Sequence, residues 1–298
     1  MFEHLVKWFL GLVGVDTTTT TLTEAIPTIV AAALLQLEEG NVVEPLVTNI
    51  DFPGPGIIHQ TPIIQKLTAE ASDGPTAQAM DSGSGAEVSP SAATVGVHSA
   101  YVQLKDIAAL GSVGDMAAVA GQLIGQCLVT RRDLDLVTLF TSLTTNQGGV
   151  STTRLAPGDL YDAYGSLRKN YAPLPFHLVL HPLQIWSTYG LISLFDNSSD
   201  AIQTQGPGTV GEDFARYGFA GMALGFNLWS DGNIALATDN GSGAAFSREA
   251  FKNVRKRGLQ IEIERDAATV ADKIVGSEIR GEAVLRNLSG NEMQFSTV

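Results

Sequence analysis

The sequence contains one cysteine, Cys127, among 298 residues. A single thiol cannot form an internal disulfide, so cysteine usage does not point to an oxidising compartment. Cys127 lies in a segment with helical periodicity, where a cysteine usually behaves as a small apolar residue, and we expect it to be buried and unreactive. Long apolar runs are missing too. None reaches the length that crosses a bilayer, so no membrane partner is expected.

Basic residues are few in this chain. It has 18 lysines and arginines against 31 aspartates and glutamates, which gives a formal net charge of -13. This excess of negative charge argues against tight binding of a phosphate backbone. It is compatible with a protein that surrounds nucleic acid without gripping it, because a negatively charged wall repels DNA. With 44% hydrophobic and 16% charged residues, the composition is that of a globular protein.

The sequence also lacks a recognisable catalytic or ligand-binding motif. His177 and His181 flank a predicted strand and stand about 13 Å apart along it, too far to share one zinc ion. Glycine-serine stretches at 83–86 and 241–245 do not match the G-x-S-x-G nucleophile turn, and the stretch at 206–213 lacks the Lys-Ser/Thr end of a phosphate loop. We therefore predict no catalytic residue, no metal ligand and no cofactor, and a chain that is not an enzyme. A hydrolase with an unrecognised serine or acid pair is the alternative from another class.

The N-terminal residues are largely apolar and show helical spacing of large side chains, at Phe2, Leu5, Phe9 and Leu12. An arm that docks on a neighbouring copy, a segment that packs on its own chain, and a membrane-surface or export helix all fit this pattern. A further helix is predicted from Thr23, a suitable N-cap, to Gly40.

Residues 42–100 are weakly hydrophobic for so long a stretch. Both ends have the composition of strands, whereas the middle consists mainly of Gly, Ser, Ala and Pro. A disordered loop is one interpretation. The other is a long hairpin that neighbouring copies of the chain hold in place, because a lone two-stranded hairpin is only marginally stable in water.

A long helix is predicted from Asp115 to Leu143, where apolar residues recur at steps of three and four. A continuous helix of this length would span about 43 Å, more than the usual helix of a globular protein. Shorter elements are expected after it: a capped helix within 156–173, a buried strand at 176–180 stopped by Pro182, a short helix at 183–190, and short strands between 196 and 243.

The end of the chain returns to strands, predicted at 257–265, 273–279 and 281–287. The first of these lies in RKRGLQIEIERDAAT, residues 255–269. Its aliphatic residues alternate with polar ones, so the aliphatic side chains and the carboxylates fall on opposite faces. A solvated outer face is the simple interpretation of so many charges. The alternative is that these charges meet other copies of the chain.

Four groups of segments follow one another in an informative order. They are TEAIPTIVAAALLQLEEGNVVEPLVTNID; VHSAYVQLKDIAALGSVGDMAAVAGQLIGQCLVTRRDLDLVTLF; FHLVLHPLQIWSTYG with GFAGMALGFNLWSDGN; and FSREAFKNVRKRGLQIEIERD with DKIVGSEIRGEAVL. In this order, over roughly residues 23 to 290, the sequence resembles the major capsid proteins of tailed bacteriophages, which have the Hong Kong 97-type fold. The match is one of order and spacing.

The resemblance implies an α+β fold with the parts of a Hong Kong 97-like capsid protein. These parts are an N-terminal arm at 1–41, an extended β-hairpin loop at 42–100, a peripheral domain with the long spine helix at 101–165 and 246–298, and an axial domain at 166–245.

It also implies a function as a structural protein that self-assembles, as pentamers and hexamers, into an icosahedral shell around double-stranded DNA. The location would be the virion, after assembly in the host cytoplasm, with portal, scaffold or decoration proteins as further partners. A shell of the encapsulin type, with a different cargo, is the nearest alternative. Closed assembly needs surfaces that meet copies of themselves. We expect five charged residues to border such contacts: Arg255, Arg257, Glu262, Glu264 and Arg265.

Overall fold

The structure is a computed structural model of the chain, and it describes residues 29–30, 33, 41–64, 88–105, 116–148, 154–186, 191 and 219–297. The chain forms two compact units, each built from separate stretches. Unit 1 comprises Met1–Gly40, Val97–Thr130 and Gly258–Glu278, and unit 2 comprises Asn41–Gly96, Arg131–Arg257 and Ile279–Val298. The four-part division expected from the sequence has other boundaries and stays a prediction.

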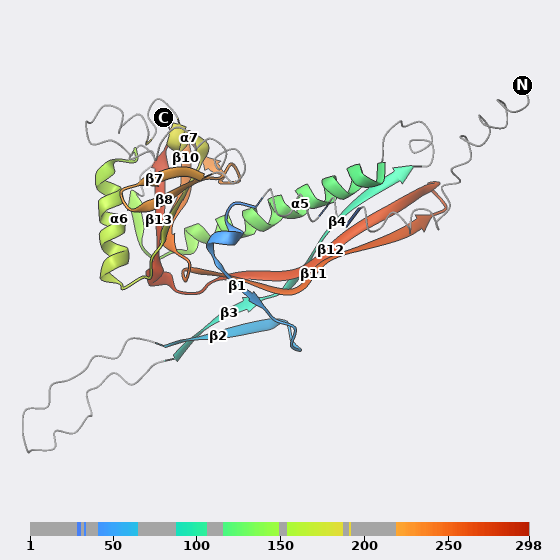
Figure 1. The fold of residues 1–298 in the computed structure, drawn as a ribbon, viewed down its shortest axis with the longest axis horizontal. Helices are drawn as coiled ribbons and strands as arrows, with labels where there is room; N and C mark the ends of the chain where they lie inside the picture. Colours follow the sequence, from blue (N-terminus) through green and yellow to red (C-terminus); the bar gives the residue numbers. More distant parts are fainter. Residues whose placement is uncertain are drawn as a thin grey trace, which may run out of the picture. The chain divides into compact units, whose positions relative to one another are not determined.

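The predicted long helix is confirmed as α5, Met116–Thr138, followed by the 3-10 turn η2, Leu139–Ser142 (Figure 1). The change from α to 3-10 geometry coincides with two threonines that bond back to the helix. Thr138 Oγ1 donates to the Asp135 carbonyl at 2.7 Å, and Thr141 Oγ1 donates to the Thr138 carbonyl at 3.0 Å. Such bonds compete with the regular helical pattern, and 3-10 geometry is frequent at the C-terminal end of an α-helix. None of the helices in the described part of the chain is long and apolar enough to cross a membrane.

Unit 1 is built where α5 covers the strands β4, Gly96–Lys105, β11, Phe251–Asp266, and β12, Ala271–Val284. Ala120, Ile124 and Leu128 recur every four residues and form the buried stripe of the helix. They pack on Ile274 of β12 and on the aliphatic face of β11. The helix approaches the sheet closely at Gly276, where an added Cβ would lie 2.4 Å from Cγ2 of Ile124.

Unit 2 contains a seven-stranded sheet with the strand order β5-β13-β10-β6-β8-β7, to which β9 adds by pairing with β10. The bounds of these strands are β5 Asn146–Gly148, β6 Phe176–Leu180, β7 Phe219–Ala223, β8 Phe226–Ser230, β9 Leu236–Ala237, β10 Asn240–Ser247 and β13 Gly290–Ser296. Unit 2 also contains two helices and a 3-10 turn: α6, Pro157–Lys169, α7, Pro182–Trp186, and η3, Asn287–Ser289.

The central strand β6 shows why this sheet is buried on both faces. Phe176, Leu178 and Leu180 pack in one core with α6, whereas Val179 packs in a second core with the end of α5. Every residue of the strand is buried. A strand covered on both sides needs a continuous apolar run instead of alternation. The predicted buried strand is thereby confirmed, and so is the first of the two helices that flank it in sequence, α6. The second is confirmed as α7 up to Trp186, and 187–190 lie outside the described residues. Figure 1 shows both helices.

The stretch predicted as an extended loop begins with the turn η1, Glu44–Leu46, and the short strand β1, Thr48–Asp51, which pairs in parallel with β11. An antiparallel hairpin follows, made of β2, Ile58–Ile64, and β3, Val88–Thr94. The prediction of strands at both ends is therefore confirmed. Its central part, 65–87, lies outside the described residues, as does the apolar segment at 2–12.

Two predictions from the sequence are wrong. The strands expected at 273–279 and 281–287 are one continuous strand, β12, because Gly281 continues it and lets β3 approach. A Cβ at Gly281 would lie 2.2 Å from the Thr94 carbonyl oxygen. Cys127 is exposed and not buried. It lies on the outer side of α5, four residues after Leu123, which is 49% exposed, because the sheet covers only the opposite stripe of the helix.

Candidate functional site

The charged strand β11 contributes Arg255 and Arg257 to unit 2. Parallel pairing places Asp51 of β1 opposite Arg255. The Arg255 Nε atom lies 2.9 Å from Oδ1 of Asp51, and the two side chains are 55% and 71% exposed. Solvent screens such a pair, so it contributes little to stability. Arg257 is half-buried.

In unit 1 the same strand carries Glu262 and Glu264. The alternation predicted from the sequence is confirmed here, since Ile261 and Ile263 pack against the α5 core while both glutamates are exposed. Two carboxylates two positions apart on one strand project from the same face. The structure thus brings Glu262 and Glu264 together on a solvent-facing surface.

Arg265 is placed differently from these glutamates. It follows the alternation of Ile263, so it falls on the other face of β11 from Glu264. Its Nη1 atom lies 3.2 Å from Oδ2 of Asp272, which is buried at the start of β12. The ion pair closes the turn between β11 and β12 within the chain. The five residues predicted as contacts therefore fall into separate groups.

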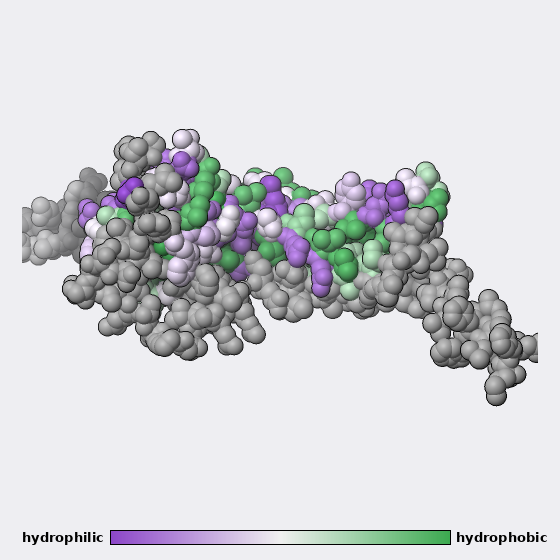
Figure 2. Space-filling model, turned by 90° about the horizontal axis from the view of Figure 1, so that it is seen from above, coloured by the Kyte–Doolittle hydropathy of each residue, from purple (hydrophilic) through white to green (hydrophobic). Residues whose placement is uncertain are grey.

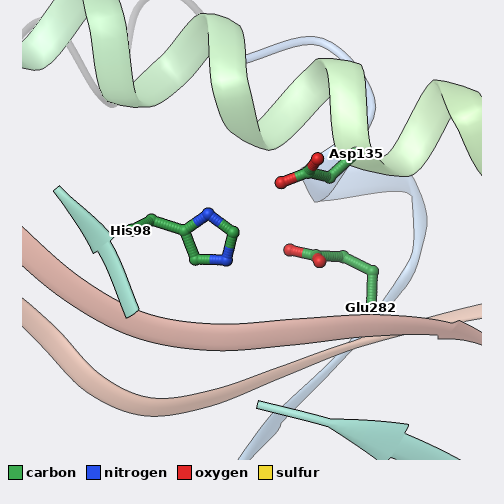
Figure 3. A group of neighbouring side chains, drawn as sticks. All are labelled: His98, Asp135 and Glu282. Carbon is green, nitrogen blue, oxygen red and sulfur yellow. The ribbon is translucent and has the colours of Figure 1, made fainter. Parts of the chain in front are cut away.

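A buried guanidinium lies between two carboxylates in unit 2. Arg280 of β12 is 2% exposed, and its Nη2 atom lies 3.3 Å from Oδ2 of Asp135 while Nη1 donates to Glu282. Figure 3 shows the carboxylates of Asp135, from α5, and Glu282, from β12, facing one another. Arg131 adds a second cation, 2.9 Å from Asp135, since residues four apart on a helix are neighbours on its surface. The guanidinium groups supply the positive charge that two facing carboxylates require.

Sequence reasoning missed Asp133, which is completely buried on α5. Its two carboxylate oxygens accept the backbone N–H groups of Val42 and Val43, at 3.1 and 3.2 Å. The neighbouring Arg132 pairs with Glu44 at 3.0 Å. Together these bonds attach residues 42–44, which precede β1, to the C-terminal part of α5. The sequence signal was an aspartate at the apolar stripe of an amphipathic helix.

A second buried acid, Asp231, lies near Asp133. It is 2% exposed, its Oδ1 atom accepts the backbone N–H of Asn233 at 2.8 Å, and its Oδ2 atom is buried without a hydrogen-bond partner. The pKa of Asp133 is raised to about 7, chiefly by burial and also by the charge of Asp231. Burial also raises the pKa of Asp231. The pair therefore favours a proton on one of the two carboxyl groups.

The two histidines near β6 have separate structural partners. Nδ1 of His177 lies 3.3 Å from the Trp229 indole nitrogen, which donates to it. Burial, with a smaller contribution from Arg248, lowers the pKa of His177 to about 4, so this ring is neutral at physiological pH. Nδ1 of His181 accepts the backbone N–H of Leu183 at 3.1 Å, at the start of α7.

The exposed surface has a mixed character. The most exposed large apolar side chains occur in different elements, for example Tyr171 at 73%, Val97 at 68% and Leu288 at 57%. Apolar and polar residues are interspersed over the face shown in Figure 2. Exposed apolar side chains are normal for a protein surface.

Comparison with known proteins gives no match to a family model and no match to a curated protein sequence. Solved structures do match. The capsid of the cyanophage P-SCSP1u has a TM-score of 0.61 at 16% identity, covering 85% of this chain and 87% of that one. The capsid of a native GTA particle has a TM-score of 0.65 at 9% identity, covering 86% and 90%. A virus-like particle from Pyrococcus furiosus has a TM-score of 0.56 at 12% identity, covering 89% and 97%.

At such low identity the shared property is the fold. The match spans most of each chain, and it includes mixed sheets with a few helices, as the sequence predicted. The chain has the α+β fold of the Hong Kong 97-type phage capsid proteins.

Proposed function

We propose that the chain is a major capsid protein, a structural protein that self-assembles into an icosahedral shell around double-stranded DNA. The supporting observation is the similarity, over 85% or more of this chain, to two capsid structures that are covered to 87% and 90% of their own chains. A fold alone does not fix a function, but a fold found across several shells favours assembly over catalysis. The virion is then the proposed location, and the host cytoplasm the proposed place of assembly.

The charge of the chain supports DNA as the content. A net charge of -13 disfavours strong binding of phosphate groups, and a dense genome packs more freely against a wall that does not bind it. Pentamers and hexamers of this chain are the proposed building blocks. Portal, scaffold or decoration proteins are proposed further partners, and the arm, loop, peripheral and axial divisions belong to the same proposal.

We also propose that the charged residues of β11 border contacts between copies. Glu262 and Glu264 are the strongest candidates, because they project together from one exposed face of the strand. Arg255, Arg257 and Arg265 complete the proposed set. Arg255 pairs with Asp51 and Arg265 pairs with Asp272 within the chain.

The test is expression of the full chain, alone and together with its flanking genes, followed by light scattering and electron microscopy. We expect closed particles with five- and six-fold capsomers. A chain that stays a monomer or small oligomer under all these conditions would contradict the proposal.

A protein compartment of the encapsulin type is the second candidate, and the similarity to the virus-like particle from Pyrococcus furiosus favours it. The contents of the particles separate the two functions. Nuclease-protected double-stranded DNA supports the capsid, whereas an enclosed protein cargo without DNA supports the compartment.

A further inference from the structure

Lys252 is a completely buried cation at the start of β11. Its ammonium group donates to the Ser91 carbonyl at 2.6 Å and to Oγ1 of Thr61 at 3.0 Å, and it lies 3.5 Å from the His59 carbonyl. These three acceptors match the three donors of an ammonium group. All three acceptors are neutral, so Lys252 differs from a buried ion pair.

The partners of Lys252 belong to both strands of one hairpin. His59 and Thr61 lie in β2 and Ser91 lies in β3, and Thr61 is directly opposite Ser91 in the antiparallel register. One side chain therefore ties both strands to β11. Ser91 extends the connection to β12, because its hydroxyl donates to the Val284 carbonyl at 2.7 Å.

Close backbone packing supports the same attachment. An added Cβ at Gly281 of β12 would lie 2.2 Å from the Thr94 carbonyl and 3.0 Å from Cα of Val95. The end of β3 thus lies directly on β12. Ala93 and Val95 pack with Val254 in a small apolar core at this point. These contacts and the hydrogen bonds of Lys252 fix the end of the hairpin at which β3 finishes, near Thr94.

The hairpin borders open space further along β2. A hollow opens there, lined by Thr61, Pro62, Ile63, Glu249, Leu285 and Arg286. Side chains do not fill this space, so packing on this side cannot by itself set the angle of the hairpin. Lys252 donates to Thr61, which borders the hollow. Because packing among the described residues is absent on that side of β2, the directions of the Lys252 hydrogen bonds have a larger effect on the angle of the hairpin.

Burial of an ammonium group is costly unless its donors are satisfied, and an apolar side chain of similar length would fill the same volume. A lysine at this position is therefore better explained by the directions of its bonds than by packing. We propose that Lys252 is a positioning residue that sets the direction of the hairpin β2–β3, and through it the way one copy presents this hairpin to the next. The second part rests on the proposed function.

Hydrogen exchange on the unassembled full chain tests the first part. In Lys252→Met, which keeps the length and loses the donors, we expect amides of β2 and β3 to exchange about tenfold faster, with β10 and β13 unchanged. Lys252→Arg retains charge and donors and should restore part of the protection. Lys273→Met, in unit 1, is the matched control and should leave the hairpin unchanged. Unchanged exchange of β2 and β3 in Lys252→Met would overturn the proposal.

Exchange that accelerates in β10 and β13 as well would show that Lys252→Met unfolds unit 2. Thr61→Val then decides, because it removes one acceptor of Lys252 and preserves shape. We expect about threefold faster exchange confined to the hairpin. Unchanged hairpin exchange in this variant would also overturn the proposal.

Particle images test the second part. We expect Lys252→Met to give irregular or fewer shells than the parent chain. A loosened hairpin with regular shells would refute the link to assembly while leaving the positioning role. A parent chain that forms no shells would refute the proposed function, and the exchange result would still decide the role of Lys252.

Discussion

The backbone N–H of Val43 donates to Oδ1 of Asp133 at 3.2 Å, across 90 positions of sequence. Asp133 accepts a second N–H from Val42, so one carboxylate holds the start of the loop region on α5. The same carboxylate faces the charge of Asp231. The Asp133 carboxylate accepts the hydrogen bonds of Val42 and Val43, but burial and the charge of Asp231 disfavour its ionised form.

This conflict predicts a pH-dependent stability. The pKa of Asp133 is about 7 in the folded chain and 3.8 as its ordinary value. Between these values the folded chain binds a proton that the unfolded chain has released, so the free energy of unfolding falls as pH rises from about 4 to 7 and then levels off. The loss is roughly 2 to 4 kcal/mol. Asp133→Asn should reduce this slope in denaturant unfolding measured from pH 4.5 to 8.

The amide of Asp133→Asn can accept one loop N–H and donate toward Asp231, so we expect this variant to be at least as stable as the parent at pH 8. Asp133→Ala leaves both N–H groups unpaired and should lose about 2 kcal/mol or more at every pH. Asp162→Asn, on the exposed side of α6, is the surface control and should keep the parental slope. An unaltered slope in Asp133→Asn would assign the pH dependence to other groups.

The strands and helices that could be predicted from the sequence are those in which the spacing of apolar residues shows which faces of the element are buried. The run at 176–180 is apolar except for His177, and the structure buries every residue of β6. The helix α5 was visible because its buried stripe recurs at steps of four. The break expected inside β12 was wrong because a glycine within a strand signals either an end or a close approach, and only the position of β3 decides between them.

Gly281→Ala is expected to destabilise unit 2. The added methyl group would lie 2.2 Å from the Thr94 carbonyl oxygen, a backbone atom that moves only with β3. The strands must separate, at a cost of about 2 to 4 kcal/mol in the free energy of unfolding. Gly258→Ala in β11, where a Cβ meets nothing within 4 Å, should be neutral or slightly stabilising. Equal thermal midpoints for the two variants would show that β3 is not held against β12.

Arg280→Met is expected to be more harmful than removal of either carboxylate partner. It leaves the half-buried carboxylates of Asp135 and Glu282 facing one another with less compensation (Figure 3), and we expect a loss of about 3 kcal/mol in the free energy of unfolding. Adding Asp135→Asn to Arg280→Met should recover part of this loss, because it removes one of the two like charges. A double variant no more stable than Arg280→Met would indicate that packing, rather than charge, causes the effect.

The polar contacts were harder to predict than the strands and helices. Asp133 and Lys252 interact with residues at positions 42–43, 61 and 91, which no periodicity links to them. A charged residue in an apolar pattern indicates only that a partner is required, and the partner is known once the fold brings distant segments together. The pair of Arg131 and Asp135 could be predicted because both lie on one helix, four residues apart.

Cys127 should react rapidly in the unassembled protein. Its side chain is exposed on the outer stripe of α5, so a thiol reagent needs no unfolding to reach it. We expect one thiol per native chain to react with a maleimide in the absence of denaturant, and none in Cys127→Ser. Labelling only after addition of denaturant would restore the original prediction of a buried thiol.

Charge reversal on β11 separates a role in assembly from a role in folding. Glu262 and Glu264 are exposed on a face that the α5 core does not use, so Glu262→Lys and Glu264→Lys should change the stability of the unassembled chain by no more than about 0.5 kcal/mol. If these carboxylates border contacts between copies, each reversal places a like charge against its partner and lowers the yield of shells.

Asp162→Lys changes the net charge equally on α6 and controls for a general effect of charge. Arg265→Glu is less selective, because it also breaks the ion pair with Asp272. Parental shell yield in both glutamate variants, measured by sedimentation and microscopy, would remove this strand from the proposed contacts.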